Sequence, residues 1–460
     1  NRIFLQHRLG QTGKVNHAPG FVFVTQTWMS CSLPELFTRW FTGLERENIP
    51  YVILHSYQDF PERVTTDVDY AVAPEALQRL PALEDQVAAE CGWLVVQRLP
   101  HEIYAYSTIL VNPEHPGEHL MLDVTTHYAR NGSRLVPATE LLAQRRRFKN
   151  FWIPHPAAEF IYLWAKTLAK FKEPQAQIPR LQELVAQAPE QCAIALKNLC
   201  GPEVGAPEDW FARPESAWRA LGKQMHRLHR YSASQRWQEF RRVWGRLRQP
   251  TGLAIAFLGP DGAGKSTVIT QVERWLLPAF RQSLHIHFNP RFDAHPSAPV
   301  SNPQGRPPRH LLVGWAKIFF YFGRHWLHWL LRQRPALIRT TLIIHDRNFE
   351  DMLVDPRRYR LRHAATLVGC LARCLPPPAV TLVLDAPGEI IHQRKAELSV
   401  AEIERQRQVL QALVATRKNW VLIPATAAAP EVATRAAREI YLRLAARNAC
   451  RKSGLVQQWS

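Results

Sequence analysis

The stretch GPDGAGKST at residues 259–267 constrains the chain more than any other feature. It satisfies the pattern G-x-x-x-x-G-K-[ST] and lies between an apolar, strand-like run, LAIAFLG, and a helix-like run, STVITQVERWLL. Glycines let successive backbone N–H groups turn toward an anion, and a following helix adds the positive field of its N-terminus. The stretch therefore predicts a phosphate-binding loop, with a purely structural glycine-rich turn as the alternative. The predicted nucleotide-binding residues are Gly259, Asp261, Gly262, Gly264, Lys265, Ser266 and Thr267.

Two acidic residues stand where later apolar runs end. Asp346 closes TLIIHD, and Asp385 closes VTLVLD. Strands that alternate with helices predict a doubly wound parallel sheet, whose ligands bind beyond the carboxyl ends of the strands. We therefore expect Asp346 and Arg347 to place a metal- or proton-directed acid beside a phosphate-directed cation. A loop cap is the alternative for either acid.

The segment IIHQRKAELSVAEIERQRQ, residues 390–408, carries a cluster of cations on a predicted helix–turn–helix. The four cations are Arg394, Lys395, Arg405 and Arg407. A lid that closes over a phosphoryl group needs such cations, because negative charge develops on its oxygens during transfer. The competing interpretation is a solvated helix face.

Residues 253–447 resemble the thymidylate-kinase-like P-loop kinases. The resemblance is carried by GPDGAGKST, by the DR pair at 346–347 and by RKAEL. It implies a nucleoside-monophosphate-kinase fold that uses ATP and Mg²⁺ and transfers the γ-phosphoryl group to an acceptor phosphate. It further implies that Lys265, Ser266 and Thr267 hold ATP, that Asp261 and Arg347 serve the acceptor, and that Arg394 belongs to the lid. The expected catalytic residues are Lys265, Asp346, Arg347 and Arg394, and the expected Mg²⁺ ligands here are Ser266 and Asp346.

The sequence departs from that family after the DR pair, where it continues NFEDMLVDPRRYR. Thymidylate kinases instead carry DRY, followed by a serine and a short aromatic motif that helps to seat thymine. The longer form is similar to divergent kinase-like proteins associated with cell-surface polysaccharide gene neighbourhoods. The resemblance therefore implies ATP as the donor and leaves the acceptor open.

A second acidic stretch, TTDVDYAV at residues 65–72, puts Asp67 and Asp69 two apart on a predicted strand. Alternate residues of a strand lie on one face, so both carboxylates are expected to point the same way. Asp123, in HLMLDVTT, stands on a later predicted strand that can pair alongside. Three such carboxylates predict a site for two Mg²⁺ ions, an arrangement used in phosphoryl and nucleotidyl transfer.

Residues 29–224 resemble the polymerase-β-like nucleotidyltransferase fold, an α+β domain with a helical appendage. In that family a glycine–serine pair normally precedes the acidic pair, close to the triphosphate. Here the matching place reads Leu54–His55–Ser56, and His55 hinders close approach. Further on, Lys166 and Lys170 share one face of a predicted helix. They either reach toward a triphosphate or extend along the surface with their charges in water, and the second reading is preferred.

These features divide the chain into six segments. Residues 1–28 are expected to be a non-native or disordered extension, because the first methionine is Met29. The other segments are a nucleotidyltransferase-like domain at 29–150, a helical appendage at 151–224, a basic linker helix at 225–252, a kinase-like domain at 253–447 and a tail at 448–460. The linker contains seven arginines and a single acid, Glu239. Its aromatic residues recur at helical spacing, so one face is expected to pack; nucleic-acid or lipid binding is the alternative.

The charge of the chain limits its partners. A formal net charge of +19 favours nucleotides, nucleic acid or an acidic membrane surface as binding partners.

The seven scattered cysteines contain no CxxC pair, which fits a reducing cytoplasm. The apolar run at 311–331 is interrupted by Lys317, Arg324 and two histidines, so it predicts a buried or amphipathic helix rather than a membrane span. We expect a cytoplasmic protein, with peripheral contact at the inner membrane face as an alternative.

The sequence thus predicts an ATP-dependent phosphotransferase acting on a phosphorylated or hydroxyl acceptor, either an anionic small molecule or a glycan. Three alternatives remain open. The first is a nucleoside-monophosphate kinase acting on dTMP, and the second is a nucleotidyltransferase that uses the N-terminal aspartates. The third is a non-enzymatic nucleotide-sensing adaptor that binds a membrane or, less favoured, nucleic acid through the basic linker.

Overall fold

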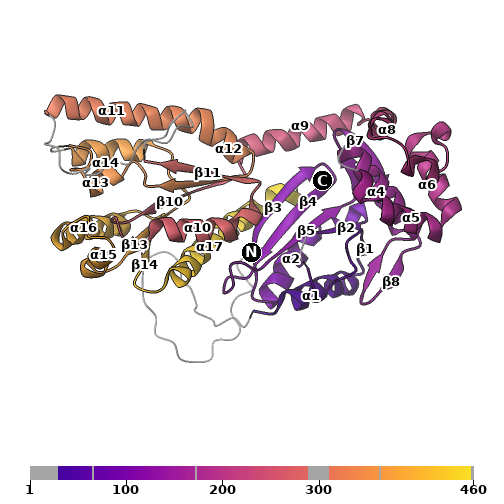
Figure 1. The fold of residues 1–460 in the computed structure, drawn as a ribbon, viewed down its shortest axis with the longest axis horizontal. Helices are drawn as coiled ribbons and strands as arrows, with labels where there is room; N and C mark the ends of the chain where they lie inside the picture. The colour runs from indigo at the N-terminus through magenta and orange to yellow at the C-terminus, as the bar shows by residue number, and fades with distance from the viewer. Residues whose placement is uncertain (1–29, 65–66, 171–173, 289–309, 362–363, 457–460) are drawn as a thin grey trace.

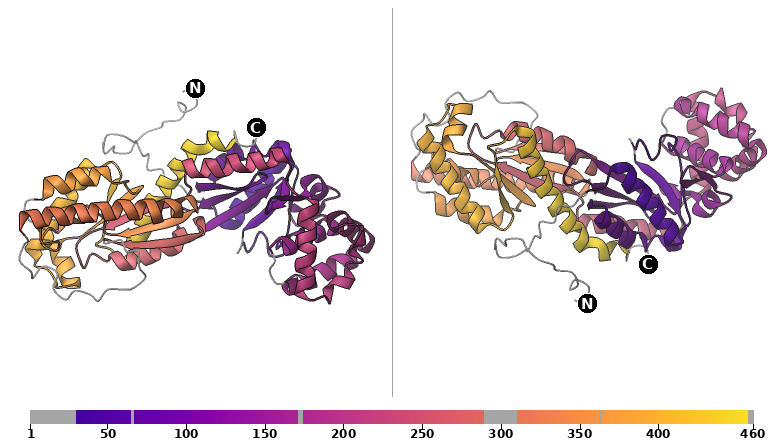
Figure 2. Two further views of the ribbon diagram at one scale, coloured as in Figure 1. Left: turned by 90° about the horizontal axis from the view of Figure 1, so that it is seen from above. Right: turned by 90° about the horizontal axis from the view of Figure 1, so that it is seen from below.

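The computed structural model describes residues 30–64, 67–170, 174–288, 310–361 and 364–456, and side chains as far as residue 451. The predicted extension at 1–28 and the proline-rich stretch at 296–309 lie outside these residues. The chain forms two sheets that lie side by side, with a helical unit at the far end of the N-terminal half (Figure 1). Figure 2 shows the same elongated arrangement from above and from below.

The N-terminal sheet has five strands in the order β1-β2-β5-β4-β3, and only the pair β2 and β5 is parallel. Its strands are β1 (Tyr51–Ile53), β2 (Val68–Val72), β3 (Leu94–Glu102), β4 (Ala105–Val111) and β5 (His119–Thr125). Helices α1 (Leu33–Arg46) and α2 (Leu80–Glu90) share a core with one face of this sheet, because each carries an apolar stripe at helical spacing. The N-terminal sheet is therefore mixed, with both helices on one face.

The strand-free region predicted after the first sheet is also present in the described residues. It contains α4 (Pro156–Lys170), α5 (Ile178–Gln187), α6 (Pro189–Cys200), α7 (Glu208–Phe211) and α8 (Glu215–Leu228). Two hairpins and a short helix connect it to the sheet: β6 (His127–Arg130) with β7 (Ser133–Pro137), α3 (Ala138–Leu142), and β8 (Arg146–Phe148) with β9 (Phe151–Ile153). Short 3₁₀ turns lie at Pro74–Ala76, Pro174–Ala176 and Pro202–Val204. The last hairpin spans residue 150, where the sequence placed a domain boundary.

The basic linker is not one helix. The chain leaves α8 at Leu228 and starts α9 (Ala233–Arg248) at a capping box, in which the Ser232 and Gln235 side chains each bond the other residue's backbone. None of the residues of α9 is buried, and Trp237 is 61% exposed. The expectation that the aromatic face of this helix packs against the protein is therefore wrong. Helical periodicity shows that α9 has an aromatic face, but it does not show whether another part of the chain covers that face.

The C-terminal sheet has five parallel strands in the order β11-β12-β10-β13-β14, which confirms the predicted parallel sheet. The strands are β10 (Leu253–Leu258), β11 (Gln282–His287), β12 (Thr341–Asp346), β13 (Val380–Asp385) and β14 (Trp420–Pro424). The helices are α10 (Lys265–Leu276), α11 (Leu311–His328), α12 (Arg334–Ile338), α13 (Asp351–Val354), α14 (Ala365–Cys374), α15 (Gly388–Arg394), α16 (Val400–Thr416) and α17 (Ala429–Val456), with a 3₁₀ turn at Leu277–Ala279 and a π-helical turn at Trp329–Gln333. Both faces of the sheet are covered, since α10 and α17 share one core with it and α13 and α16 share another.

Helix α17 joins the two halves. It continues through residue 447, where the sequence ended the kinase-like domain, and packs on β3 of the other sheet. The Tyr441 hydroxyl donates to the backbone oxygens of Pro116 at 3.0 Å and Trp275 at 2.9 Å, which lie in opposite halves. Asn448 donates to the Val95 oxygen at 3.3 Å. The two sheets therefore share a continuous core, and their relative position is fixed by packing.

One long side of the molecule carries many exposed apolar side chains. Helices α11, α12 and α9 run along the same side in both views (Figures 1 and 2). We call their exposed residues the apolar surface: Leu311, Leu312, Val313, Trp315, Phe319, Phe320, Trp326, Leu327, Leu330, Leu331, Trp237, Phe240, Val243, Trp244 and Leu247. Helix α11 is thus amphipathic, as one of the two readings predicted. None of the described helices is long and apolar enough to cross a membrane.

Candidate active site

The turn between β10 and α10 is built from glycines in conformations that other residues rarely adopt. Gly259, Gly262 and Gly264 have φ angles of 149°, 94° and 87°. A Cβ atom at Gly259 would lie 2.8 Å from the Leu384 oxygen, and one at Gly262 would lie 2.9 Å from the Ile391 oxygen. Both positions therefore need glycine for space as well as for backbone freedom. The loop is held closely between the end of β13 and helix α15.

Helix α10 starts at Lys265, directly after this turn. The backbone N–H groups of its first turn have no partner within the helix, and its N-terminus carries a partial positive charge. Ser266 and Thr267 lie in this first turn and are exposed. The predicted succession of a strand, a glycine turn and a helix N-terminus is therefore present.

The side chain of Lys265 folds back over its own loop. Its Nζ donates to the backbone oxygens of Gly259 at 2.8 Å and Pro260 at 3.0 Å, and lies 3.6 Å from Asp261 Oδ1. Burial, together with the positive charge of Arg347, lowers the pKa of this amine. The amine is thus held in the loop by neutral oxygens and one carboxylate, all of which phosphate oxygens could replace.

Asp261 and two arginines form a compact ion cluster beside the loop. Arg347 Nη2 and Arg358 Nη1 donate to different oxygens of Asp261, the latter at 2.9 Å. Burial alone would raise the pKa of Asp261, but Arg347 and Lys265 together hold it below its usual value. Arg347 also lies 3.5 Å from Asp351, which accepts a bond from Tyr359 at 2.6 Å. No sequence motif had indicated a role for Arg358 or Asp351.

Asp346 ends β12, and its backbone pairs with Phe257 of β10. Its Oδ2 lies 3.4 Å from His287 Nδ1, whereas its Oδ1 is buried and has no hydrogen-bond partner among the described residues. Both polar side-chain atoms of Asn348 are likewise buried without a partner there. A buried polar atom without a partner is costly, and a bound cation or water would satisfy it. The chemistry of Asp346 Oδ1 and the Ser266 hydroxyl thus fits a Mg²⁺ ion.

The predicted helix–turn–helix is present as the helix pair α15 and α16, and its cations are bonded within the chain. Arg407 donates to both oxygens of Asp385, at 2.7 and 3.1 Å, and also binds Glu404. Arg394 donates to the Ala425 oxygen at 2.9 Å. Arg405 pairs with Glu402 at 2.6 Å, and Lys395 with Glu397 at 3.1 Å. The role of Arg394 and its neighbours in catalysis stays a prediction.

The second acidic centre lies in the N-terminal half. Asp69 of β2 and Asp123 of β5 are direct partners in the parallel pair of strands. Both line, together with Asp67, a cavity of about 260 Å³. The structure therefore brings the three predicted aspartates to one cavity. No three His, Cys, Asp or Glu residues are grouped closely enough to hold a metal ion within the described part of the chain.

A lysine and a histidine bind Asp69 in that cavity. Lys166 Nζ lies 2.8 Å from Asp69 Oδ2, and His55 Nε2 lies 2.6 Å from the same oxygen. Lys170 lines the same cavity. The preferred reading of Lys166 as a surface lysine is therefore wrong. The side chain that replaces the expected glycine, His55, is part of the network that neutralises Asp69 through Oδ2. The role of the three aspartates as metal ligands stays a prediction.

The two paired carboxylates differ in their charge. Burial raises the pKa of Asp69, but His55 and Lys166 reverse this and bring it well below its usual value. Burial and the nearby charges of Asp69 and Asp67 raise the pKa of Asp123 to about 7, and Asp123 Oδ1 is buried with no partner among the described atoms. The pair thus contains one ionised carboxylate and one that retains its proton up to neutral pH.

The C-terminal half also contributes to this cavity. Arg281, at the start of β11, lines it together with residues of β2, β5 and α4. No short motif contains this arginine, so it could not be predicted from the sequence. The acidic cavity is therefore closed by both halves of the chain.

No protein-family model matches the chain, and no curated protein matches it.

The raised pKa of Asp123 predicts a pH dependence of stability. The proton on Asp123 stabilises the fold fully below about pH 4, and this contribution is lost as the pH rises to about 7. We expect Asp123→Asn to remove that loss. Denaturant unfolding in a chelator-containing buffer should show a variant that gains stability over the wild type, by up to a few kcal/mol, between pH 4 and 7. Parallel pH profiles for the two proteins would contradict this assignment.

Proposed function

We propose that the chain is an ATP-dependent phosphotransferase, which transfers the γ-phosphoryl group of ATP to a phosphorylated or hydroxyl acceptor. The observation that carries this proposal is the glycine turn at 259–264, which is followed at once by the N-terminus of α10 and by Lys265. The charge of Asp346 acts on the Lys265 amine, and Asp346 has one buried oxygen with no partner among the described residues. Backbone N–H groups, a buried cation and a strand-end carboxylate are the components that phosphoryl transfer requires.

Each residue has a distinct part in this proposal. The loop N–H groups bind the phosphates, and Lys265 exchanges the oxygens of Gly259 and Pro260 for phosphate oxygens. Ser266 and Asp346 would hold Mg²⁺, which would neutralise charge on the phosphates of bound ATP. Most of the catalysis comes from positioning and from charges that are already oriented.

The ion cluster beside the loop favours an anionic acceptor. Asp261 orients the guanidinium groups of Arg347 and Arg358 at the edge of the loop. Guanidinium groups bind phosphates and carboxylates through paired N–H donors. This arrangement supports a phosphorylated small molecule or an acidic glycan, and it is equally compatible with a nucleoside monophosphate such as dTMP.

A transfer assay tests the proposal. We expect γ-labelled ATP with Mg²⁺ to label a member of a panel of nucleoside monophosphates and cell-surface glycan precursors. Lys265→Ala should lower transfer at least about a hundredfold, because it removes a charged contact to the phosphoryl oxygens. The matched control is Lys418→Ala, since Lys418 is exposed and distant in sequence from the loop.

The acceptor that takes the label identifies the substrate class. Full transfer by Lys265→Ala would contradict the assigned role of the loop. Pyrophosphate release that depends on Asp67 and Asp69 would favour the nucleotidyltransferase alternative. ATP binding without any transfer would favour the nucleotide-sensing adaptor.

The apolar surface supports a peripheral position at an acidic membrane. Phe320 and Trp237 are about equally exposed, at 60% and 61%. Exposed cations, including Arg236, Arg241 and Arg332, are interspersed among such side chains. Apolar side chains combined with cations on one helical side are typical of proteins that bind at the surface of an anionic membrane.

Vesicle flotation tests this position. We expect binding to vesicles of equal parts phosphatidylcholine and phosphatidylglycerol, weaker binding to pure phosphatidylcholine, and a loss of binding at high salt. The double variant Phe320→Gln/Trp237→Gln should reduce binding about tenfold or more, because it removes two apolar contacts. Ile194→Gln is the control, since Ile194 is 60% exposed on α6, away from this surface. A stable dimer that does not bind vesicles would show that a second copy covers the surface.

A further inference from the structure

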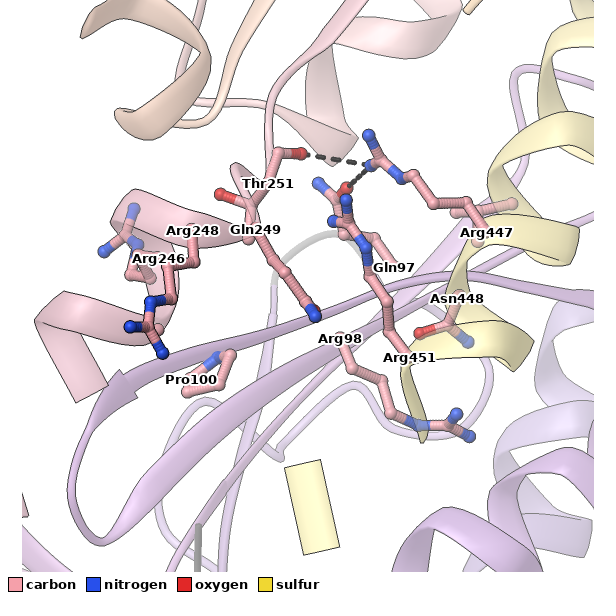
Figure 3. A pocket seen from close by; sticks show the side chains of 12 residues that line it. Gln97, Arg98, Pro100, Arg246, Arg248, Gln249, Thr251, Arg447, Asn448 and Arg451 are labelled. Atoms are coloured by element: carbon pink, nitrogen blue, oxygen red, sulfur yellow. Dashed lines mark hydrogen bonds between the residues drawn. The ribbon is translucent and has the colours of Figure 1, made fainter. Parts of the chain in front are cut away.

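The junction of the two halves contains a pocket that neither of the described centres uses. It has a volume of about 210 Å³ and is lined by residues of β3, the end of α9, the segment before β10 and the end of α17. Figure 3 shows Arg447 and Arg451 on the α17 side of this pocket and Arg246 and Arg248 on the α9 side. Segments far apart in the sequence thus bring four arginines to one place.

The positive charge of this pocket is not balanced. A fifth arginine of the lining, Arg98, is neutralised by Glu84 and Asp85 at 2.6 Å each. No acidic residue lines the pocket, and the other four arginines make no ion pair within the described residues. Like charges placed together repel each other, and burial strengthens the repulsion because less water screens them.

Neutral oxygens hold the guanidinium groups in position. Arg447 donates to the backbone oxygens of Gly252 at 2.7 Å and Thr251 at 3.1 Å, and to Gln97 Oε1 at 2.7 Å. Arg451 donates to the Pro250 oxygen at 2.9 Å. These bonds orient the arginines and leave their charges intact. Burial and the proximity of Arg451 lower the pKa of Arg447 to about 9, which reflects the cost of an unbalanced charge.

Arg246 supplies a donor that is still free. Its Nη2 donates to the Ile338 oxygen and to Thr340 Oγ1, both at 3.1 Å. Its Nε is buried and has no partner among the described residues. Arg248, near the end of α9, is exposed and lies 5.2 Å from the centre of the Trp244 ring. The pocket therefore combines hydrogen-bonded arginines with one exposed arginine.

We propose that this pocket binds a small phosphate-type polyanion, with inorganic pyrophosphate as the representative ligand. Guanidinium groups recognise phosphate oxygens through paired N–H donors, and several of them together favour a ligand with more than one charge. A volume of 210 Å³ is below the roughly 300–1,000 Å³ of pockets for drug-sized molecules, which favours a compact anion over a whole nucleotide.

Such a ligand would act on both halves at once. Its binding residues belong to β3 of the N-terminal sheet, to the linker helix and to α17. Arg447 also holds the oxygens of Thr251 and Gly252, directly before the first residue of β10, Leu253. The same strand ends at the glycine turn of the candidate active site. A bound anion thus stabilises the junction by neutralising its arginines and adds a contact at the start of this strand.

Isothermal titration calorimetry with sodium pyrophosphate tests the proposal. The full chain carrying Lys265→Ala is used, because pyrophosphate could also bind the glycine turn. Ionic strength is held constant with sodium chloride, and inorganic phosphate is titrated separately. We expect saturable binding of pyrophosphate that is at least about tenfold tighter than binding of phosphate, and a rise in the thermal unfolding temperature.

Two variants locate the binding. Arg451→Gln and Arg248→Gln should each weaken pyrophosphate binding about tenfold, the loss expected when one charged hydrogen bond is removed. Arg443→Gln is the matched control, because Arg443 is an exposed arginine of the same helix outside the pocket. Circular dichroism checks that the variants keep their fold. Absence of saturable binding, or binding that both pocket variants leave unchanged, would overturn the proposal.

Discussion

The approach of two backbone oxygens to the turn after β10 is the constraint on which the candidate active site depends. The Leu384 and Ile391 oxygens leave no room for a Cβ atom at Gly259 or Gly262. The loop is therefore shaped by the end of β13 and by α15. In the phosphoryl transfer that we propose, a site shaped in this way does not have to reorganise when charge develops, which is the main requirement for electrostatic catalysis.

The contact between the halves places the other sites relative to that loop. Helix α17 packs against both sheets, and the Tyr441 hydroxyl binds backbone oxygens of each half. As a result Arg281 reaches the acidic cavity of the N-terminal half, and the arginine pocket lies where β10 starts. The two halves thus form a single packed unit, in which a ligand at the junction is connected to the glycine turn by one short strand.

Local features of the fold could be predicted from the sequence, because short motifs encode them. The glycine turn, the start of α10 and the strand-end position of Asp346 all follow from residues within a few positions of each other. Strands β11 and β14 were not predicted, since SLHIH alternates weakly and WVLIP is short. Their place in the sheet depends on neighbours that are distant in the sequence.

Long-range electrostatic partners could not be predicted. Lys166 and Asp69 are 97 residues apart, and only the packing of α4 beside β2 brings them together. The cations of the predicted lid have carboxylates of their own, for example Asp385 for Arg407. Charge counts along the sequence do not reveal such pairs, because an ion pair is decided by distance in the folded chain.

We propose the glycine turn at 259–267 as the place where ATP binds. Amide hydrogen exchange, measured with and without Mg²⁺ and ATP, probes this turn. We expect slower exchange in the turn and the first turn of α10, and no such change in the Lys265→Ala variant. Protection confined to the strands around Asp69 and Asp123, with the turn unchanged, would contradict it.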